Sequence, residues 1–166
     1  MKELGIRTYS ADEINAELLR DKGYIEKLSA SFPFAVKDGK VDKAALREEV
    51  FSNEEKRKTL NALAHPEIRR KIEEITGDAV VEVPLLFESG MTDLFDRVIV
   101  VTAGEDVRIN RVVSTRNISK DLAKNIIKNQ ATDDERIKRA DYVAINDGTR
   151  KDLYEQAKNI IKRIFE

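Results

Sequence analysis

Short β-branched and aromatic runs alternate with longer amphipathic segments along this chain, which is the hydrophobic pattern of an α/β protein. The runs predict strands at 6–10, 79–83, 97–102 and 141–146. The third run is almost continuously apolar, as expected for a parallel strand that is covered on both faces. The pattern therefore predicts an α/β fold with a mainly parallel sheet.

The strand at 79–83 ends at Pro84 and leads into Leu85, Leu86, Phe87 and Glu88. A buried strand would thus deliver a loop with both apolar and acidic side chains. Enzymes of the α/β class place their chemistry at such carboxyl ends of parallel strands. On periodicity alone, an ordinary core strand explains the run at least as well.

The segment 24–76 is predicted to be almost entirely helical, which indicates a helical subdomain inserted between two strands. Asp38-Gly39 is a turn signal, and Asp42 can cap a helix over 43–51. A capping box at 52–55 precedes a helix over 56–63.

Pro66 suits the first turn of a further helix that runs to about residue 76, where Gly77 supplies a stop. The pattern places His65 in the break between two helices. A lone histidine is more often a capping or packing residue than a catalyst, and a pH switch is the alternative.

Asp12 lies where the first strand passes into an amphipathic helix over 12–19, whose N-cap is Asp12 or Ser10. An N-cap aspartate is common. The functional alternative is a carboxylate at the carboxyl edge of the sheet.

The C-terminal half is predicted to contain helices over 105–115, 119–128, 133–139 and 150–165, the third opened by a capping box at 132–135 and the last capped by Thr149. The first of them carries Arg108 and Arg111, and Arg116 lies just beyond its end. Such a cluster is either a solvated face or a clamp for phosphate oxygens, and spacing alone does not separate the two.

Composition narrows the function classes. The 166 residues include 30 Lys and Arg against 31 Asp and Glu, so no global charge draws the chain to nucleic acid or to an anionic membrane. The chain has no cysteine and one histidine, which excludes disulfides, thiol nucleophiles and a histidine-rich metal site. No apolar run is long enough to span a bilayer, and we expect a soluble, cytoplasmic protein of one main domain.

Several of these segments occur in an order and spacing that resembles the dephospho-CoA kinase family, over essentially the whole chain. The segments are Ser10-Ala11-Asp12-Glu13-Ile14, Leu63-Ala64-His65-Pro66-Glu67-Ile68, Val83-Pro84-Leu85-Leu86-Phe87-Glu88-Ser89-Gly90, Arg97-Val98-Ile99-Val100-Val101, Arg111 with Arg116, and Gln130 leading to Ala140-Asp141 and Asn146-Asp147-Gly148.

The resemblance implies a P-loop-kinase-like three-layer α/β/α fold in a single domain over 1–166. Residues 24–76 would be the helical substrate-binding insertion and 104–140 the lid. The implied reaction is the last step of coenzyme A biosynthesis, in which ATP with Mg²⁺ phosphorylates the 3′-hydroxyl of the ribose in dephospho-CoA.

The resemblance also implies roles for individual residues. Asp12 would orient and deprotonate the hydroxyl, although Ser10 stands where the family has a second carboxylate. The lid's Arg111 and Arg116 would be catalytic and would bind the ATP phosphates, and ATP would also contact Asn146. The dephospho-CoA site would consist of His65, Leu86, Phe87 and Glu88. Two lid positions depart from the family pattern, with Asn117 in place of an aspartate and Ile126 in place of an arginine.

The family also carries an amino-terminal strand and a Gly-x-x-x-x-Gly-Lys-Ser/Thr phosphate loop, a motif that the 166 residues do not contain. The interpretation is an amino-terminally truncated copy that lacks a central strand. We expect this chain alone to have little or no kinase activity, and its unpaired strand edges to permit self-association. The alternatives are a non-catalytic module that binds dephospho-CoA or CoA, and a structural protein completed by a partner's strand.

Overall fold

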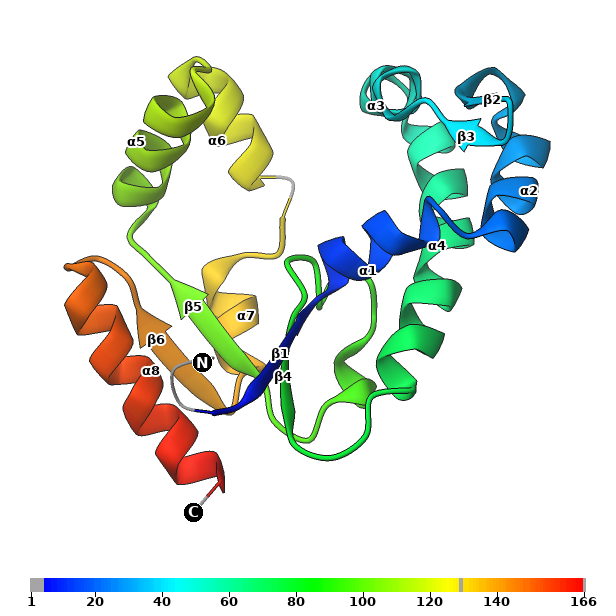
Figure 1. Cartoon of the computed structure of the whole chain (residues 1–166). Coiled ribbons are helices and arrows are strands. Elements are labelled where there is room, and N and C mark those ends of the chain that lie inside the picture. The colour runs from blue at the N-terminus through cyan, green and yellow to red at the C-terminus, as the bar shows by residue number, and fades with distance from the viewer. Residues whose placement is uncertain (1–4, 129, 166) are drawn as a thin grey trace. The chain divides into compact units, whose positions relative to one another are not determined.

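A computed structural model describes residues 5–128 and 130–165, apart from the side chains of residues 51 and 52 (Figure 1). The chain forms two compact units that divide between Pro84 and Leu85. We describe each unit by itself.

The N-terminal unit contains a two-stranded parallel sheet and a group of helices. Its elements are β1 (Arg7–Ser10), α1 (Ala11–Leu18), α2 (Lys22–Ser31), the 3-10 turn η2 (Pro33–Ala35), β2 (Val36–Lys37), β3 (Lys40–Val41), α3 (Lys43–Ser52), α4 (Glu54–Glu73) and β4 (Ala79–Glu82). Strands β1 and β4 pair in parallel, with Arg7 opposite Ala79 and Ser10 opposite Glu82. Their carboxyl ends therefore lie at the same edge of this sheet.

The helices of this unit pack around a small apolar core of Leu28, Phe32, Ala35 and Leu46. Phe32 and Leu28 are almost fully buried, at 1% and 0% exposure. The predicted cap at Asp42 is confirmed, because its side chain accepts a hydrogen bond from Ala45 N. The capping box predicted at 52–55 is only partly correct, since α3 extends to Ser52 and the N-cap of α4 is Asn53, whose side chain accepts from Lys56 N.

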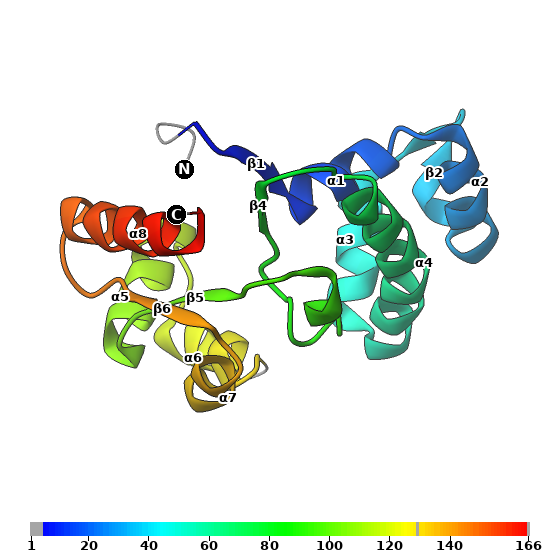
Figure 2. The ribbon, with the colours of Figure 1, turned by 90° about the horizontal axis from the view of Figure 1, so that it is seen from below.

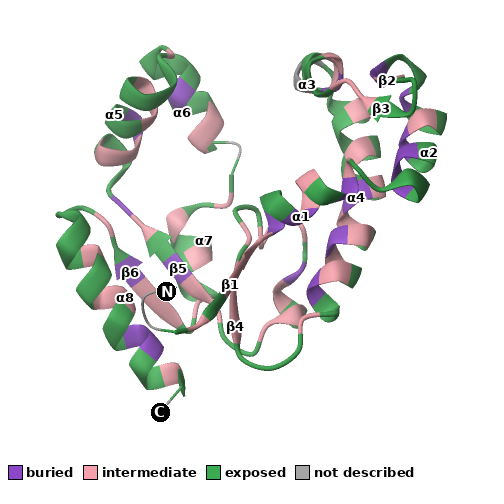
Figure 3. Cartoon of the chain, viewed as in Figure 1, coloured by how far each residue is buried: buried purple, intermediate pink, exposed green. Residues whose placement is uncertain are grey.

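The predicted helix break at His65-Pro66 is wrong. Helix α4 runs without interruption from Glu54 to Glu73 and contains Pro66 in its interior. Proline has no N–H to donate to the carbonyl oxygen four residues earlier, so the helix loses one bond there. Ala64, Ile68 and Ile72 lie four residues apart and are buried along one side of α4 (Figure 3). Their packing outweighs the local preference of proline for a helix start.

The segment 24–76 is also not purely helical. Strands β2 and β3 form a short antiparallel hairpin, with Val36 opposite Val41. Asp38 and Gly39 both have positive φ, at 50° and 70°, as required at the centre of a type I′ turn. The turn predicted at Asp38-Gly39 is confirmed. The strands on either side were not predicted, because two residues are too few to show the alternation of apolar and polar positions that indicates a strand.

The C-terminal unit contains a second two-stranded parallel sheet with helices around it. Its elements are the 3-10 turn η3 (Thr92–Leu94), β5 (Ile99–Thr102), α5 (Glu105–Arg116), α6 (Lys120–Lys128), α7 (Asp133–Lys138), β6 (Tyr142–Ile145) and α8 (Arg150–Phe165). Strands β5 and β6 pair in parallel, with Ile99 opposite Tyr142 and Thr102 opposite Ile145. Helix α8 lies along β6 (Figure 2) and buries Ile160 and Ile161.

The α/β class and the parallel pairing predicted from the sequence are thus confirmed, in two separate two-stranded parallel sheets. Helix α7 begins with the predicted capping box, in which Thr132 and Glu135 bond each other's main chain. Thr149 and Asp152 make the same reciprocal pair at the start of α8. The predicted cap of α1 is only partly correct, since Ser10 occupies the N-cap position but its side chain accepts no capping hydrogen bond.

Candidate functional site

Asp12 lies in the first turn of α1, two residues after β1 ends. Ser10 has extended backbone angles, with φ −129° and ψ 131°, so the chain turns from strand to helix at that residue. The carboxylate of Asp12 is exposed near the amino terminus of the helix, where the helix dipole favours negative charge. Asp12 therefore lies at the carboxyl edge of a parallel sheet and at the start of a helix.

The loop 85–90 belongs to the C-terminal unit and is a compact turn. Ser89 N donates to the carbonyl oxygen of Leu85 at 2.9 Å, and the Ser89 hydroxyl donates to that of Leu86 at 3.1 Å. Met91, which is 3% exposed, anchors its far end. These bonds fix the backbone that carries Leu86, Phe87 and Glu88.

Phe87 and Glu88 both contact the segment that ends the predicted lid. Glu88 Oε1 accepts a hydrogen bond from Ala131 N at 2.8 Å. The guanidinium carbon of Arg139 lies 4.6 Å from the centre of the Phe87 ring, which is the geometry of a cation–π contact. The loop 85–90 is thus joined at two points to the chain on either side of α7.

Of the three residues predicted to bind ATP, the structure brings together Arg111 and Asn146, which lie on separate segments of the chain. Arg111 lies on α5, and its Nη1 donates to the main-chain oxygen of Asn146 at 2.7 Å. Close by, Gly104 N donates to Asp147 Oδ1 at 2.7 Å. These bonds join the chain that follows β5 to the chain that follows β6, at the carboxyl edge of their sheet.

Arg116 does not join this pair. It is exposed at the end of α5, five residues after Arg111, and five residues of α-helix correspond to a rotation of about 140° and a rise of about 7.5 Å. Asn117 follows in the left-handed conformation, with φ 51°, which asparagine adopts more readily than most residues. The departure from the family pattern at Asn117 therefore has a local backbone reason.

Arg108, the remaining arginine of the predicted cluster, is neutralised within the protein. Asp133 Oδ2 lies 2.7 Å from Arg108 Nη2, and Asp133 Oδ1 also bonds the guanidinium of Arg136. Asp133 is the first residue of α7, so this carboxylate links the start of α5 to the start of α7. Sequence reasoning missed this network, because only the Asp133–Arg136 pair, three residues apart, is local, whereas Arg108 lies 25 residues from Asp133.

His65 is half-buried in the interior of α4. Burial lowers its pKa below the ordinary value of a histidine, so the neutral imidazole is favoured. Two residues further along, Glu67 forms an ion pair with Lys27 on α2 at 2.6 Å. The hydrogen bond from Lys27 is the largest cause of a lowered pKa at Glu67. His65 is thus a packed residue next to a helix–helix ion pair.

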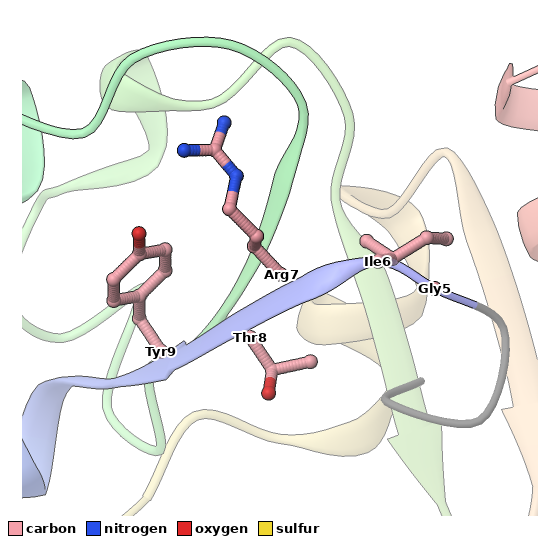
Figure 4. A pocket seen from close by; sticks show the side chains of 5 residues that line it. All are labelled: Gly5, Ile6, Arg7, Thr8 and Tyr9. Atoms are coloured by element: carbon pink, nitrogen blue, oxygen red, sulfur yellow. The ribbon is translucent and has the colours of Figure 1, made fainter.

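A shallow surface hollow in the described part of the chain contains none of these residues. It lies along β1, measures about 360 Å³ and is lined by residues 5–9 (Figure 4). The side chains of Arg7 and Tyr9 point to one side of the strand and Thr8 to the other, as alternation in a strand requires. Arg7 donates to the main-chain oxygens of Thr76 and Asp78, so its guanidinium serves the adjoining loop.

Within the described residues, no group of three or more acidic or histidine side chains could hold a metal ion. Magnesium in phosphoryl-transfer sites is commonly bound by one or two carboxylates together with the nucleotide's own phosphates. A single exposed carboxylate such as that of Asp12 is suited to a magnesium ion that arrives already bound to a nucleotide. It is less suited to a magnesium ion held by protein ligands alone. Over the same residues, no helix is long and apolar enough to cross a membrane.

Comparison with known proteins gives one consistent result. The family model described as dephospho-CoA kinase matches residues 1–152. The chain is similar to the dephospho-CoA kinase of Fusobacterium nucleatum, with 34% identity over an alignment of 171 positions. The alignment covers 99% of this chain and 89% of that protein. It is also similar to the dephospho-CoA kinase of Geobacillus kaustophilus, with 35% identity, covering 98% of this chain and 87% of that protein.

Two solved structures share the fold. The crystal structure of TT1252 from Thermus thermophilus has a TM-score of 0.80 and 30% identity, covering 99% of this chain and 87% of that one. The dephospho-CoA kinase from Campylobacter jejuni has a TM-score of 0.71 and 28% identity, covering 98% of this chain and 87% of that one.

Proposed function

This chain belongs to the dephospho-CoA kinase family, and from that premise we propose that it acts as an ATP-dependent kinase on dephospho-CoA. The ribose 3′-hydroxyl oxygen attacks the γ-phosphorus of ATP, the bond to the bridging oxygen breaks, and ADP leaves. The hydroxyl proton passes to a carboxylate. The alternative of a non-catalytic binding module is not favoured, because the relatives named above are kinases.

The observation that carries the proposal is the position of Asp12. It stands directly beyond the carboxyl end of a parallel strand, in the first turn of a helix. This is where α/β folds place groups that act on bound ligands. An exposed carboxylate there can accept the proton of a hydroxyl within hydrogen-bond reach. We assign Asp12 as the general base.

The remaining roles follow the same proposal. Residues 24–76 form the helical insertion that holds dephospho-CoA, with His65 on its long helix, and Leu86, Phe87 and Glu88 line the acceptor site. Residues 104–140 form the lid. Arg111 and Arg116, which project from different sides of α5, bind the phosphates of ATP in this proposal, and Asn146 contacts the nucleotide. Positive groups there stabilise the charge that spreads over the transferring phosphoryl group.

ATP is bound with Mg²⁺ in this proposal, and the metal supplies charge neutralisation between the phosphates when present. The chain's own contribution is positional: Arg111 is held at the edge of its sheet by the bond to Asn146 O. The 166 residues contain no Gly-x-x-x-x-Gly-Lys-Ser/Thr loop, which in P-loop enzymes supplies the backbone donors and the lysine for the phosphates. Arginines alone do not replace that set, so the proposed activity requires such a loop in addition to the residues described.

The test uses a chain extended ahead of residue 1 by a strand and such a loop. We expect ATP-dependent 3′-phosphorylation of dephospho-CoA, and a loss of about 10²–10⁴ in kcat in Asp12→Asn, the usual contribution of a general base. Glu13→Gln, at the exposed neighbouring acid, is the matched control and should keep its activity. Equal kcat in Asp12→Asn and the parent would remove Asp12 from this role.

A further inference from the structure

Arg139 lies over Phe87 in the C-terminal unit, 52 positions along the chain, and nothing in the family resemblance draws attention to it. We infer that Arg139 is a positioning residue for the acceptor site, which holds the ring of Phe87 in place. This inference rests on the proposed function, since Phe87 is assigned to dephospho-CoA there.

The first argument is geometric. The guanidinium carbon lies 4.6 Å from the ring centre, so the planar cation covers one face of Phe87. Phe87 is only half-buried, and the hydrogen bonds of its turn use main-chain atoms and the Ser89 hydroxyl; Phe87 contributes only its carbonyl oxygen, which accepts from Gly90 N at 3.3 Å. The turn therefore fixes the backbone, while the orientation of the ring depends on what lies against it.

The second argument is that Arg139 belongs to a helix that is fixed at both ends. It is the C-cap residue of α7, and its own N–H donates to the carbonyl oxygen of Arg136 at 3.2 Å. The start of the same helix is fixed by the Thr132–Glu135 capping box and by the pairing of Asp133 with Arg108. A guanidinium carried by a helix fixed in this way can hold a side chain on a neighbouring loop.

The third argument is the second contact between the same two segments. Glu88 Oε1 accepts from Ala131 N at 2.8 Å, at the other end of α7. Residues 87 and 88 are adjacent, and their partners flank one short helix. The loop is thus held against α7 by a hydrogen bond at one end and by the Arg139–Phe87 contact at the other.

The test is a double-mutant cycle on dephospho-CoA binding to the 166-residue chain, measured by calorimetry. We expect Arg139→Ala to weaken binding about fivefold, the factor expected for an exposed cation–π contact. In a Phe87→Leu background the same substitution should have almost no further effect, because the ring through which Arg139 acts is gone. Lys138→Ala removes a neighbouring exposed charge and is the control that should match the parent.

The cycle separates positioning from simple attraction. If Arg139 acted only as a charge near the ligand's phosphates, Arg139→Lys would restore full affinity, and Arg139→Ala would cost the same factor with and without Phe87. Either result overturns the inference, as does equal binding by Arg139→Ala and the parent chain. We expect Arg139→Lys to restore only part of the affinity, because an ammonium does not cover the ring as a planar guanidinium does.

A ligand-free measurement tests the contact itself. Protons of the Arg139 side chain over an aromatic face have upfield-shifted NMR resonances, and Phe87→Leu should abolish that shift. If the parent chain showed the shift but bound no dephospho-CoA, the proposed function would fail together with the role inferred for Arg139, and only the contact would stand. If it bound dephospho-CoA without the shift, the inference alone would fail.

Discussion

Arg111 donates from Nη1 to the main-chain oxygen of Asn146 at 2.7 Å, which fixes a guanidinium from α5 at the carboxyl edge of the β5–β6 sheet. The bond uses one of the five N–H donors of the guanidinium and leaves the rest available to a ligand. Two residues that are 35 positions apart therefore form one element of the proposed nucleotide site.

Arg111→Ala should weaken ATP binding about tenfold in a chain extended by the phosphate loop, since hydrogen bonds to charged groups contribute about 1.5–3 kcal/mol. Dephospho-CoA affinity should change much less. Calorimetric titration with each ligand measures the two effects. Arg150→Ala, which removes an exposed arginine at the start of α8, is the charge-matched control. A larger effect on dephospho-CoA than on ATP would contradict the lid assignment.

Asp133→Ala should destabilise the chain by about 2 kcal/mol, because it leaves the guanidiniums of Arg108 and Arg136 close together without the carboxylate that joins them. The three side chains are 20–28% exposed, so the pairing is stronger than that of a solvated surface pair. Urea unfolding measures the change. Asp134→Ala removes the adjacent exposed acid and should cost far less; equal losses would show that the network carries no special stability.

The sequence was sufficient wherever a structure depends on a few adjacent residues. The caps at Asp42, Thr132 and Thr149 were predicted because each is a side chain that bonds a main-chain N–H three residues on. The strands were predicted because their apolar runs reflect burial in a sheet. Helix α4 was predicted incorrectly at Pro66, where buried side chains one turn apart outweigh a local signal.

The candidate site was predicted less completely, for a physical reason. Resemblance to a family indicated Arg111 and Asn146 separately, and the bond between them depends on how β5, α5 and β6 fold together. No local pattern indicates the contact of Arg139 with Phe87 or that of Asp133 with Arg108, because the two residues of each pair meet only in three dimensions. Their sequence neighbours predict only a capped helix.

His65 should make the chain less stable as the pH falls from 7.5 to 5.5. Burial lowers the pKa of His65 in the folded chain, so below about pH 6.5, the ordinary pKa of histidine, the unfolded chain binds a proton that the folded chain resists. The stabilising contribution is therefore present above the unfolded pKa and is lost as the pH falls toward the folded one. Urea midpoints at the two pH values measure the loss.

His65→Gln is the control for that measurement, because His65 is the one histidine in the 166 residues. The variant should show a smaller loss of stability over the same pH interval. Carboxylates whose pKa is lowered, such as Glu67, do not change charge between pH 5.5 and 7.5. An unchanged pH dependence in His65→Gln would show that burial of this imidazole does not govern it.

Gln156 should protect one edge of the C-terminal sheet. Its Oε1 accepts from Ile145 N at 2.9 Å and its Nε2 donates to Ile145 O at 2.8 Å, so the side-chain amide takes the place of a neighbouring strand. Ile145 is itself 54% exposed. An apolar residue with free main-chain groups at a sheet edge is a template for pairing with another chain.

Gln156→Ala should therefore lower stability by about 1 kcal/mol, the net contribution of such hydrogen bonds where water can replace them, and should raise self-association. Urea unfolding measures the first effect, and sedimentation velocity over a range of concentrations measures the second. Glu155→Ala, at the exposed neighbouring position on α8, should change neither. If Gln156→Ala stayed as monomeric as the parent while losing stability, the amide would stabilise α8 against β6 without protecting the edge, and the proposed self-association would have to use another strand.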